Sequence, residues 1–96
     1  MLFVATCTDR PESMGLRIAT RPAHLAYLTS LGDRVKAGGA LLTPDRQAVV
    51  GSLLIFEGES DEEIAELLAN DPYSRAGLFE DVDIKPWRQA VGAPLS

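Results

Sequence analysis

The chain has only one cysteine and one histidine, Cys7 and His24, among its 96 residues. One cysteine cannot form a disulfide within the chain, which favours a reducing compartment such as the cytosol. One cysteine and one histidine are too few for a structural zinc site, so we expect no metal, and no other cofactor is indicated. We expect Cys7 to be an ordinary strand residue, because a lone small thiol usually behaves as a hydrophobic side chain.

The chain also lacks an excess of positive charge and a long hydrophobic run. It has 9 lysines and arginines against 14 acidic residues, which gives a formal net charge of -5. No basic stripe is present to neutralise phosphates, and this argues against partners such as nucleic acids and membrane surfaces. No run of about 18 apolar residues predicts a membrane-spanning helix. The opening Met-Leu-Phe-Val-Ala-Thr lacks the basic segment of a signal peptide, so none is expected.

What is present is the composition of one small globular domain. Hydrophobic residues make up 46% and charged residues 24% of the chain, and both values are ordinary for globular proteins. A chain of 96 residues is long enough for one modest core. We therefore expect a single domain over residues 1–96, ordered from about residue 2 to residue 88 and followed by an irregular tail.

Periodicity and turn residues predict the element order βαββαβ. Strands are expected at 2–8, 34–42, 49–57 and 78–87, and helices at 13–31 and 60–69, with a short helical turn at 72–76. Pro22 either kinks the first helix or divides it, with Thr20 capping its main part. Ser60 and Glu63 form a capping box for the second helix. This order favours an α+β, ferredoxin-like split βαβ sheet with both helices on one face.

The predicted strand over 49–57 is apolar on both of its faces. Its two alternating sets are Leu53 with Ile55, and Val50 with Leu54 and Phe56. A sheet covered by helices on one face and by water on the other would alternate apolar and polar residues instead. We therefore expect a homodimer in which a second copy covers the face opposite the helices, and we assign the Val50 set to that face together with Phe3. The alternative is that the C-terminal tail or charged edge residues cover it.

His24 lies where one stripe of the first predicted helix changes from polar to apolar. At helical spacings it follows Arg17, Thr20 and Arg21 and precedes Tyr27, Leu28 and Leu31. A residue at such a junction tends to line a pocket wall near its mouth. The alternative is a half-buried structural histidine with a backbone partner.

Asp71 follows the second predicted helix, in phase with its apolar stripe. It also precedes Pro72, which makes it a good N-cap for the turn that follows. The two roles are compatible, because a capping carboxylate keeps a second oxygen for an imidazole. If Asp71 meets His24, the carboxylate fixes the tautomer of the imidazole, and the pair is able to transfer protons near neutral pH. Spacing alone does not establish that contact.

Small residues in the second predicted strand give a further indication of a pocket. Gly38 and Gly39 remove side-chain bulk, which either leaves room for a ligand or marks a bulge. Neither they nor any other stretch match a phosphate-binding loop. Ser52 lacks the surroundings of a nucleophilic serine and is expected to be an ordinary strand residue.

Several segments, in their order and spacing along the chain, resemble the YCII-related (YciI-like) family. They are Arg17–Leu28, the small-residue strand with the strand Gly51-Ser52-Leu53-Leu54-Ile55 after it, Asn70–Tyr73 with Ala76–Phe79, and the ending Ile84-Lys85-Pro86-Trp87. The resemblance runs from Met1 to about Arg88. It implies a ferredoxin-like fold that dimerises into an α/β barrel, and a His–Asp pocket that corresponds here to His24 and Asp71. The family is similar in fold to small dimeric isomerases, monooxygenases and dehydrochlorinases that act on ring compounds.

Two functions from different classes follow. The first is a small cofactor-independent enzyme, of lyase or isomerase type, in which His24 and Asp71 transfer protons on a small organic molecule such as a ring compound. The second is a non-catalytic dimer that binds a small molecule or serves as an accessory protein. The candidate pocket-lining residues are Arg17, Arg21, Tyr73 and Ser52.

Overall fold

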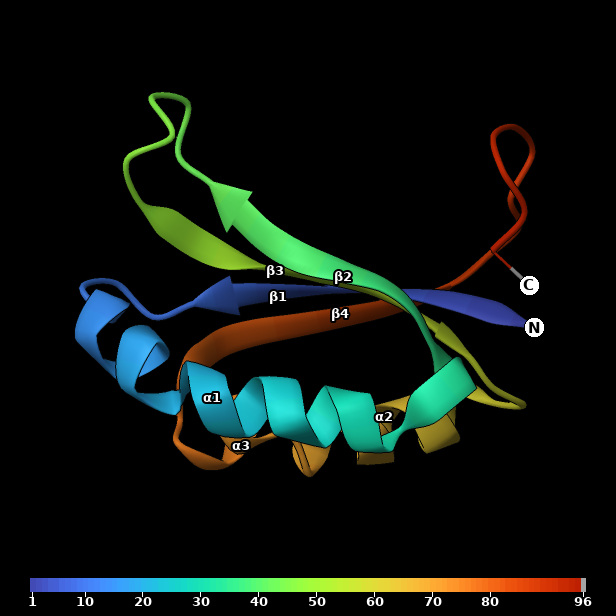
Figure 1. Cartoon of the computed structure of the whole chain (residues 1–96), viewed down its shortest axis with the longest axis horizontal. Helices are drawn as coiled ribbons and strands as arrows, with labels where there is room; N and C mark the ends of the chain where they lie inside the picture. Colours follow the sequence, from blue (N-terminus) through green and yellow to red (C-terminus); the bar gives the residue numbers. More distant parts are fainter. Residues whose placement is uncertain (96) are drawn as a thin grey trace.

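The computed structural model describes residues 1–95 and shows one antiparallel sheet with all of its helices on one face (Figure 1). The sheet order is β2-β3-β1-β4. The strands are β1 (Leu2–Asp9), β2 (Val35–Leu42), β3 (Val49–Glu57) and β4 (Phe79–Trp87), and the helices are α1 (Met14–Ser30), α2 (Asp61–Ala69) and the short α3 (Pro72–Arg75), with a 3-10 turn at Gly32–Arg34. This is the ferredoxin-like fold expected from the sequence.

β1 is the central strand, and it pairs antiparallel with β3 on one side and β4 on the other. The backbones of β1 and β3 approach closely at Gly51, where a Cβ atom would overlap the carbonyl oxygen of Cys7. The side chains of Phe3, Ala5 and Cys7 are fully buried. They lie under the helices and form the floor of the core.

The helices cover the face of the sheet that the sequence analysis assigned to the dimer interface. Phe3 pairs with Phe56 and Ala5 with Leu54, and all four are buried in the core. Val50 shares their alternation but lies near the end of β3, where it is exposed. The assignment of Phe3, Leu54, Phe56 and Val50 to a dimer face is therefore wrong. The pattern misled because both faces of β3 are apolar, and alternation separates the two sets without saying which one the helices cover.

Helix α1 runs through Pro22 without a break, so Thr20 does not cap a separate helix. Proline has no N–H to donate to the carbonyl four residues earlier, here that of Ile18. The side chain of Ile18 is 64% exposed, so this turn of the helix is open to solvent. Water is then able to hydrate the unpaired carbonyl, which explains why the proline is tolerated.

Side-chain caps define the starts of α2 and α3 as the sequence predicted. The Ser60 hydroxyl accepts a hydrogen bond from the Glu63 N–H at 3.2 Å. The Glu63 carboxylate accepts from the Glu59 N–H at 2.8 Å, one residue earlier than in a regular capping box. Asp71 caps α3 by accepting from the Tyr73 N–H at 2.9 Å. This cap places Asp71 against α1, because α1 and α3 pack together.

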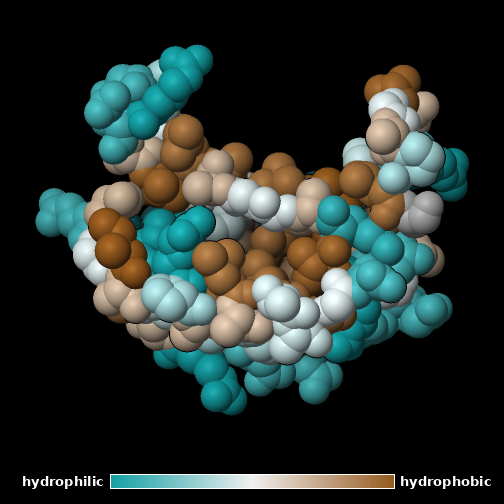
Figure 2. Space-filling model, viewed as in Figure 1, coloured by the Kyte–Doolittle hydropathy of each residue, from teal (hydrophilic) through white to brown (hydrophobic). Residues whose placement is uncertain are grey.

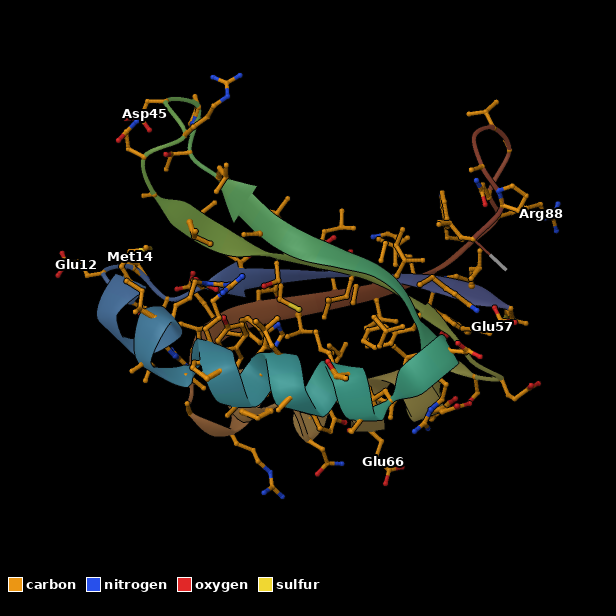
Figure 3. All side chains as sticks on the ribbon, in the orientation of Figure 1. Glu12, Met14, Asp45, Glu57, Glu66 and Arg88 are labelled. Atoms are coloured by element: carbon orange, nitrogen blue, oxygen red, sulfur yellow. The ribbon has the colours of Figure 1, made fainter. Side chains whose placement is uncertain are left out.

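The face of the sheet away from the helices is open and mainly apolar. Its central residues are Val4, Thr6, Leu53 and Ile55. Two arms rise beyond this face, one formed by the β2–β3 loop and the other by the tail over residues 88–95 (Figure 1). Apolar atoms lie between the arms in Figure 2, and Figure 3 places Asp45 on one arm and Arg88 on the other. Within residues 1–95, no helix is long and apolar enough to cross a membrane.

Candidate functional site

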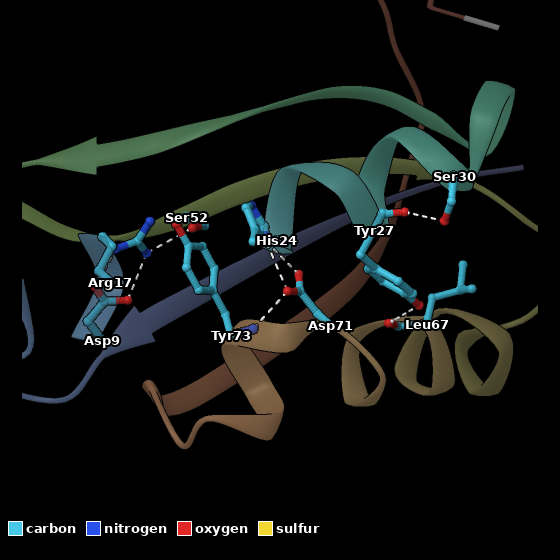
Figure 4. A network of polar contacts seen from close by, with 9 residues as sticks. All are labelled: Asp9, Arg17, His24, Tyr27, Ser30, Ser52, Leu67, Asp71 and Tyr73. Atoms are coloured by element: carbon cyan, nitrogen blue, oxygen red, sulfur yellow. Dashed lines mark hydrogen bonds and ion pairs between the residues drawn. The ribbon is translucent and has the colours of Figure 1, made fainter. Parts of the chain in front are cut away.

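His24 of α1 and Asp71 at the start of α3 meet in a buried contact (Figure 4). Nδ1 of His24 lies 2.9 Å from both carboxylate oxygens of Asp71. His24 is 6% exposed and Asp71 is fully buried. The structure thus brings together the two residues that the sequence analysis singled out 47 positions apart.

The contact determines which nitrogen of the imidazole carries the hydrogen. An ionised carboxylate only accepts hydrogen bonds, so neutral His24 must donate from Nδ1. Nε2 is then the basic nitrogen, and it has no hydrogen-bond partner among residues 1–95. This is the arrangement of a histidine that a carboxylate orients to accept a proton.

Tyr73 fixes the plane of the imidazole from one side. Its ring stacks on His24 with 3.9 Å between centroids and an 18° angle between planes. It also meets Phe79 edge to face, with 5.9 Å between centroids. Since the backbone N–H of Tyr73 is held by Asp71, one short segment supplies both the carboxylate and the stacking ring.

A second buried ion pair, between Asp9 and Arg17, lies beyond Tyr73. Arg17 donates from Nε and Nη2 to the two carboxylate oxygens of Asp9 at 2.7 and 2.8 Å, and from Nη2 to the Ser52 hydroxyl at 2.9 Å. Its guanidinium carbon lies 4.7 Å from the centroid of the Tyr73 ring. Burial lowers the pKa of Arg17, but the hydrogen bond and the charge of Asp9, together with Tyr73, raise it, and the net shift is upward, so the guanidinium stays charged.

Asp9 is the residue of this network that sequence reasoning missed. The predicted first strand ends at residue 8, but Asp9 is the last residue of β1 and is buried. The available signal was an acidic residue between the first predicted strand and the helix that carries Arg17. That signal is weak, because an acidic residue before a helix is usually solvated or caps it.

A cavity of about 260 Å³ lies between α1 and the β2–β3 strands, with His24 in its wall. Gly38, Gly39 and Ala40 form its β2 side, which agrees with the expectation that small residues leave room there. The candidate pocket residues Arg17, Arg21, Ser52 and Tyr73 also line it, whereas Asp71 is absent from its lining. A larger hollow of about 590 Å³ lies at the end of the sheet near Met1 and Trp87, away from these residues.

Two further ionisable groups near the cavity are held neutral. Burial, reinforced by the charge of Asp71, raises the pKa of the Cys7 thiol to about 12, so this cysteine is not a nucleophile near neutral pH. Burial also raises the pKa of Tyr73, although the charges of Arg17 and Arg21 oppose the shift. Among residues 1–95, no cluster of three histidine, cysteine or acidic side chains is arranged to hold a metal ion.

The sequence and the fold match known proteins over most of the chain. The family model of the YCII-related domain matches residues 1–88. Protein YciI of Escherichia coli is 36% identical over 100 residues, which cover 93% of this chain and 98% of that protein. A protein of Emericella nidulans named derivative of benzaldehyde biosynthesis cluster protein C is 36% identical over 74 residues, which cover 69% of this chain and 76% of that protein.

A solved structure is similar over nearly the whole fold. It is the 5-chloro-2-hydroxyhydroquinone dehydrochlorinase of Burkholderia phenoliruptrix AC1100, in complex with 2,5-dihydroxybenzoquinone. The TM-score is 0.85 at 38% sequence identity, and the match covers 94% of this chain and 96% of that chain.

Proposed function

The chain belongs to the family of YCII-related domains, and from that premise we propose that it is a small enzyme in which His24 and Asp71 transfer protons on a small ring compound. The observation that carries the proposal is the orientation of His24. Asp71 holds Nδ1 at 2.9 Å, and Nε2 is left without a partner in a residue that lines a cavity.

The reaction follows from the chemistry of this pair. Nε2 of His24 accepts a proton from a hydroxyl or an acidic C–H of the substrate, and Asp71 stabilises the imidazolium that forms. The electron pair left on the substrate either expels a leaving group, which is a lyase reaction, or is protonated by His24 at another atom, which is an isomerisation. Asp71 accepts the hydrogen bond from Nδ1 throughout and keeps the imidazole in one tautomer.

The size of the cavity and the relatives support a single-ring substrate. A volume of about 260 Å³ lies below the range of about 300–1,000 Å³ that is typical for drug-sized ligands. The similar dehydrochlorinase is named for a chlorinated hydroquinone, and its structure holds a dihydroxybenzoquinone. By analogy, we propose that elimination from a hydroxylated ring is the first reaction to test on this chain.

The test is chloride release from 5-chloro-2-hydroxyhydroquinone by the purified protein. We expect release by the wild type, a loss of about 100-fold or more in His24→Gln, and a smaller loss in Asp71→Asn. Ser30→Ala is the matched control, because Ser30 lies on the same helix and is exposed outside the cavity. If His24→Gln retained the wild-type rate, His24 would not be the acid–base residue, and if the wild type bound the compound without releasing chloride, the protein would be a binding module.

We further propose that the protein works as a homodimer joined through the open face of the sheet. Val4, Leu53 and Ile55 present a half-buried apolar surface there, between the two arms. An exposed apolar surface bordered by polar segments is typical of a protein–protein interface. A stable interface of this kind typically buries about 2,000 Å² or more.

A further inference from the structure

The end of the cavity away from His24 contains a buried hydroxyl whose hydrogen has no acceptor. Ser52 is 2% exposed and lines the cavity. Its oxygen accepts a hydrogen bond from Nη2 of Arg17 at 2.9 Å, so the hydroxyl hydrogen must point away from Arg17. Among residues 1–95, no acceptor receives that hydrogen. A buried donor without an acceptor costs free energy, unless a bound molecule supplies the acceptor.

Tyr73 brings a second hydroxyl to the same end. Figure 4 shows its hydroxyl directed toward Arg17 and Ser52, away from Asp71. No residue within 1–95 accepts the hydrogen of this hydroxyl, and Tyr73 is only 1% exposed. Burial raises the pKa of Tyr73, so the hydroxyl remains a donor at neutral pH.

Arg21 adds a positive charge to the cavity wall. It lies one helical turn after Arg17, and both line the cavity. The charge of Arg17 is matched by Asp9, but Arg21 forms no ion pair with any residue that the structure describes. In a chain with a net charge of -5, a free cation beside unmatched hydroxyl donors favours a negatively charged ligand.

We propose that this end of the cavity binds an oxyanion of the substrate, with Ser52 donating a hydrogen bond to the charged oxygen and Arg21 supplying the opposite charge. This rests on the proposed function, in which the rest of the ring reaches Nε2 of His24. Arg17 and His24 are seven residues apart, or about 10 Å along the helix axis, a span that accommodates one substituted ring. The substrate class is therefore a small phenolate, enolate or aromatic carboxylate, and not a neutral ring.

The test measures whether the protein prefers an anion over its neutral form. The probe is 4-nitrophenol, whose phenolate is yellow and whose ionisation is read by absorbance on the protein and in free solution. We expect the bound probe to ionise at a lower pH, which corresponds to about a tenfold or greater preference for the phenolate. Benzoate and benzamide form a second pair, and they show whether a carboxylate satisfies the site as well as a phenolate does.

Two variants and two controls assign the preference to the proposed residues. Arg21→Gln and Ser52→Ala should each reduce the preference for the anion severalfold, whereas Arg75→Gln, which removes an exposed arginine outside the cavity, should leave it unchanged. Because Arg21 is exposed, its variant folds even if loss of the Ser52 hydroxyl disturbs buried Arg17. Ser30→Ala should also leave the preference unchanged, because Ser30 is exposed on the same helix and lies outside the cavity.

These outcomes separate the binding site from the catalytic proposal. Suppose that the wild type releases chloride and His24→Gln does not, but the wild type binds the charged and neutral forms of the probes equally. The oxyanion site would then be wrong, and the catalytic pair would stand. If the wild type preferred the anion but released no chloride, the oxyanion site would stand and the catalytic pair would lose its support. Failure of both anionic probes to bind at about 1 mM, or an unchanged preference in both Arg21→Gln and Ser52→Ala, would also overturn the oxyanion site.

Discussion

At the scale of single residues, Asp71 combines a structural and a chemical role. It caps α3 through the Tyr73 N–H and receives Nδ1 of His24 with the same carboxylate. A carboxylate has enough acceptor positions for both partners. The position of the proposed base therefore depends on the cap that starts the next helix.

This double role predicts different results for two substitutions of Asp71. Asp71→Asn keeps an oxygen that is able to cap α3, so we expect a loss of about 1 kcal/mol or less in the free energy of unfolding. Asp71→Ala removes the cap and leaves buried His24 without its partner, so we expect a loss of about 2 kcal/mol. Urea unfolding followed by circular dichroism measures both values. Equal losses in the two variants would show that the oxygen at this position does not stabilise α3.

Cys7 provides a prediction about pH. Burial raises the pKa of Cys7 from its ordinary value of 9.0 to about 12, so the folded state favours the neutral thiol. The stabilisation is complete below pH 9, and it is lost as the pH rises from 9 toward 12, because the unfolded chain ionises first. The melting temperature of the wild type should therefore fall more steeply over this range than that of Cys7→Ala. Parallel curves for the two proteins would contradict the raised pKa.

The same shift predicts slow alkylation of Cys7. At pH 8 the thiolate fraction should be about 1,000-fold smaller in the folded than in the unfolded protein, from the difference in pKa alone. Reaction with iodoacetamide, followed by mass spectrometry, should thus be slow until urea unfolds the chain. Rapid labelling of the folded protein would show that Cys7 is accessible and ionised.

At the scale of elements, β2 shapes the cavity by having almost no side chains in its middle. Gly38 pairs with Leu54 and faces α1, whereas Gly39 pairs with Leu53 on the open face. A Cβ atom at Gly38 would lie 2.6 Å from Cδ2 of Leu54, but one at Gly39 would meet nothing within 4 Å. Adjacent glycines therefore differ sharply in the room that surrounds them.

This difference makes the two glycines a matched pair for mutation. Gly38→Ala should displace the buried Leu54 side chain and reduce the free energy of unfolding by about 1 kcal/mol, since extra volume in a packed core is unfavourable. It should also weaken binding of the nitrophenolate probe, because it narrows the cavity. Gly39→Ala should change stability by less than about 0.5 kcal/mol. Similar effects of the two substitutions on binding would show that β2 does not limit the cavity.

At the scale of the whole molecule, the sheet has one face for the candidate site and one face that we propose for assembly. The helix side holds the core, the His24–Asp71 pair and the Asp9–Arg17 pair. The other side presents Val4, Leu53 and Ile55 between two arms, with no segment of residues 1–95 lying across them (Figures 1 and 2). One thin sheet thus provides the floor of the cavity and the proposed dimer surface.

The dimer proposal predicts which apolar residue controls assembly. Leu53→Glu places a charge in the proposed interface and should convert a dimer to a monomer at micromolar concentration in analytical ultracentrifugation. Ile18→Glu is the control, because Ile18 is 64% exposed on α1 and should leave the dimer intact. A monomeric wild type, or a dimer that Leu53→Glu leaves unchanged, would contradict the open-face interface.

The sequence by itself determined the local elements and the two main candidates for the site. Strand alternation, the Ser60 cap and the Asn70-Asp71-Pro72 break depend on neighbours a few residues apart, so their positions are readable in order along the chain. The inward phase of Asp71 and the polar-to-apolar junction at His24 are also local patterns. For the same reason, the small residues of β2 indicated a cavity before its walls were known.

Only the tertiary structure decided which groups meet across the chain. The contact of His24 with Asp71, the role of Asp9, and the exposure of Ser52 to the cavity depend on how α1 and α3 pack over the sheet. The tertiary structure also determines that Phe3, Leu54 and Phe56 point into the core. Alternation with a period of two gives two faces, and on β3 both are apolar, so only packing against α1 and α2 determines which face becomes the core.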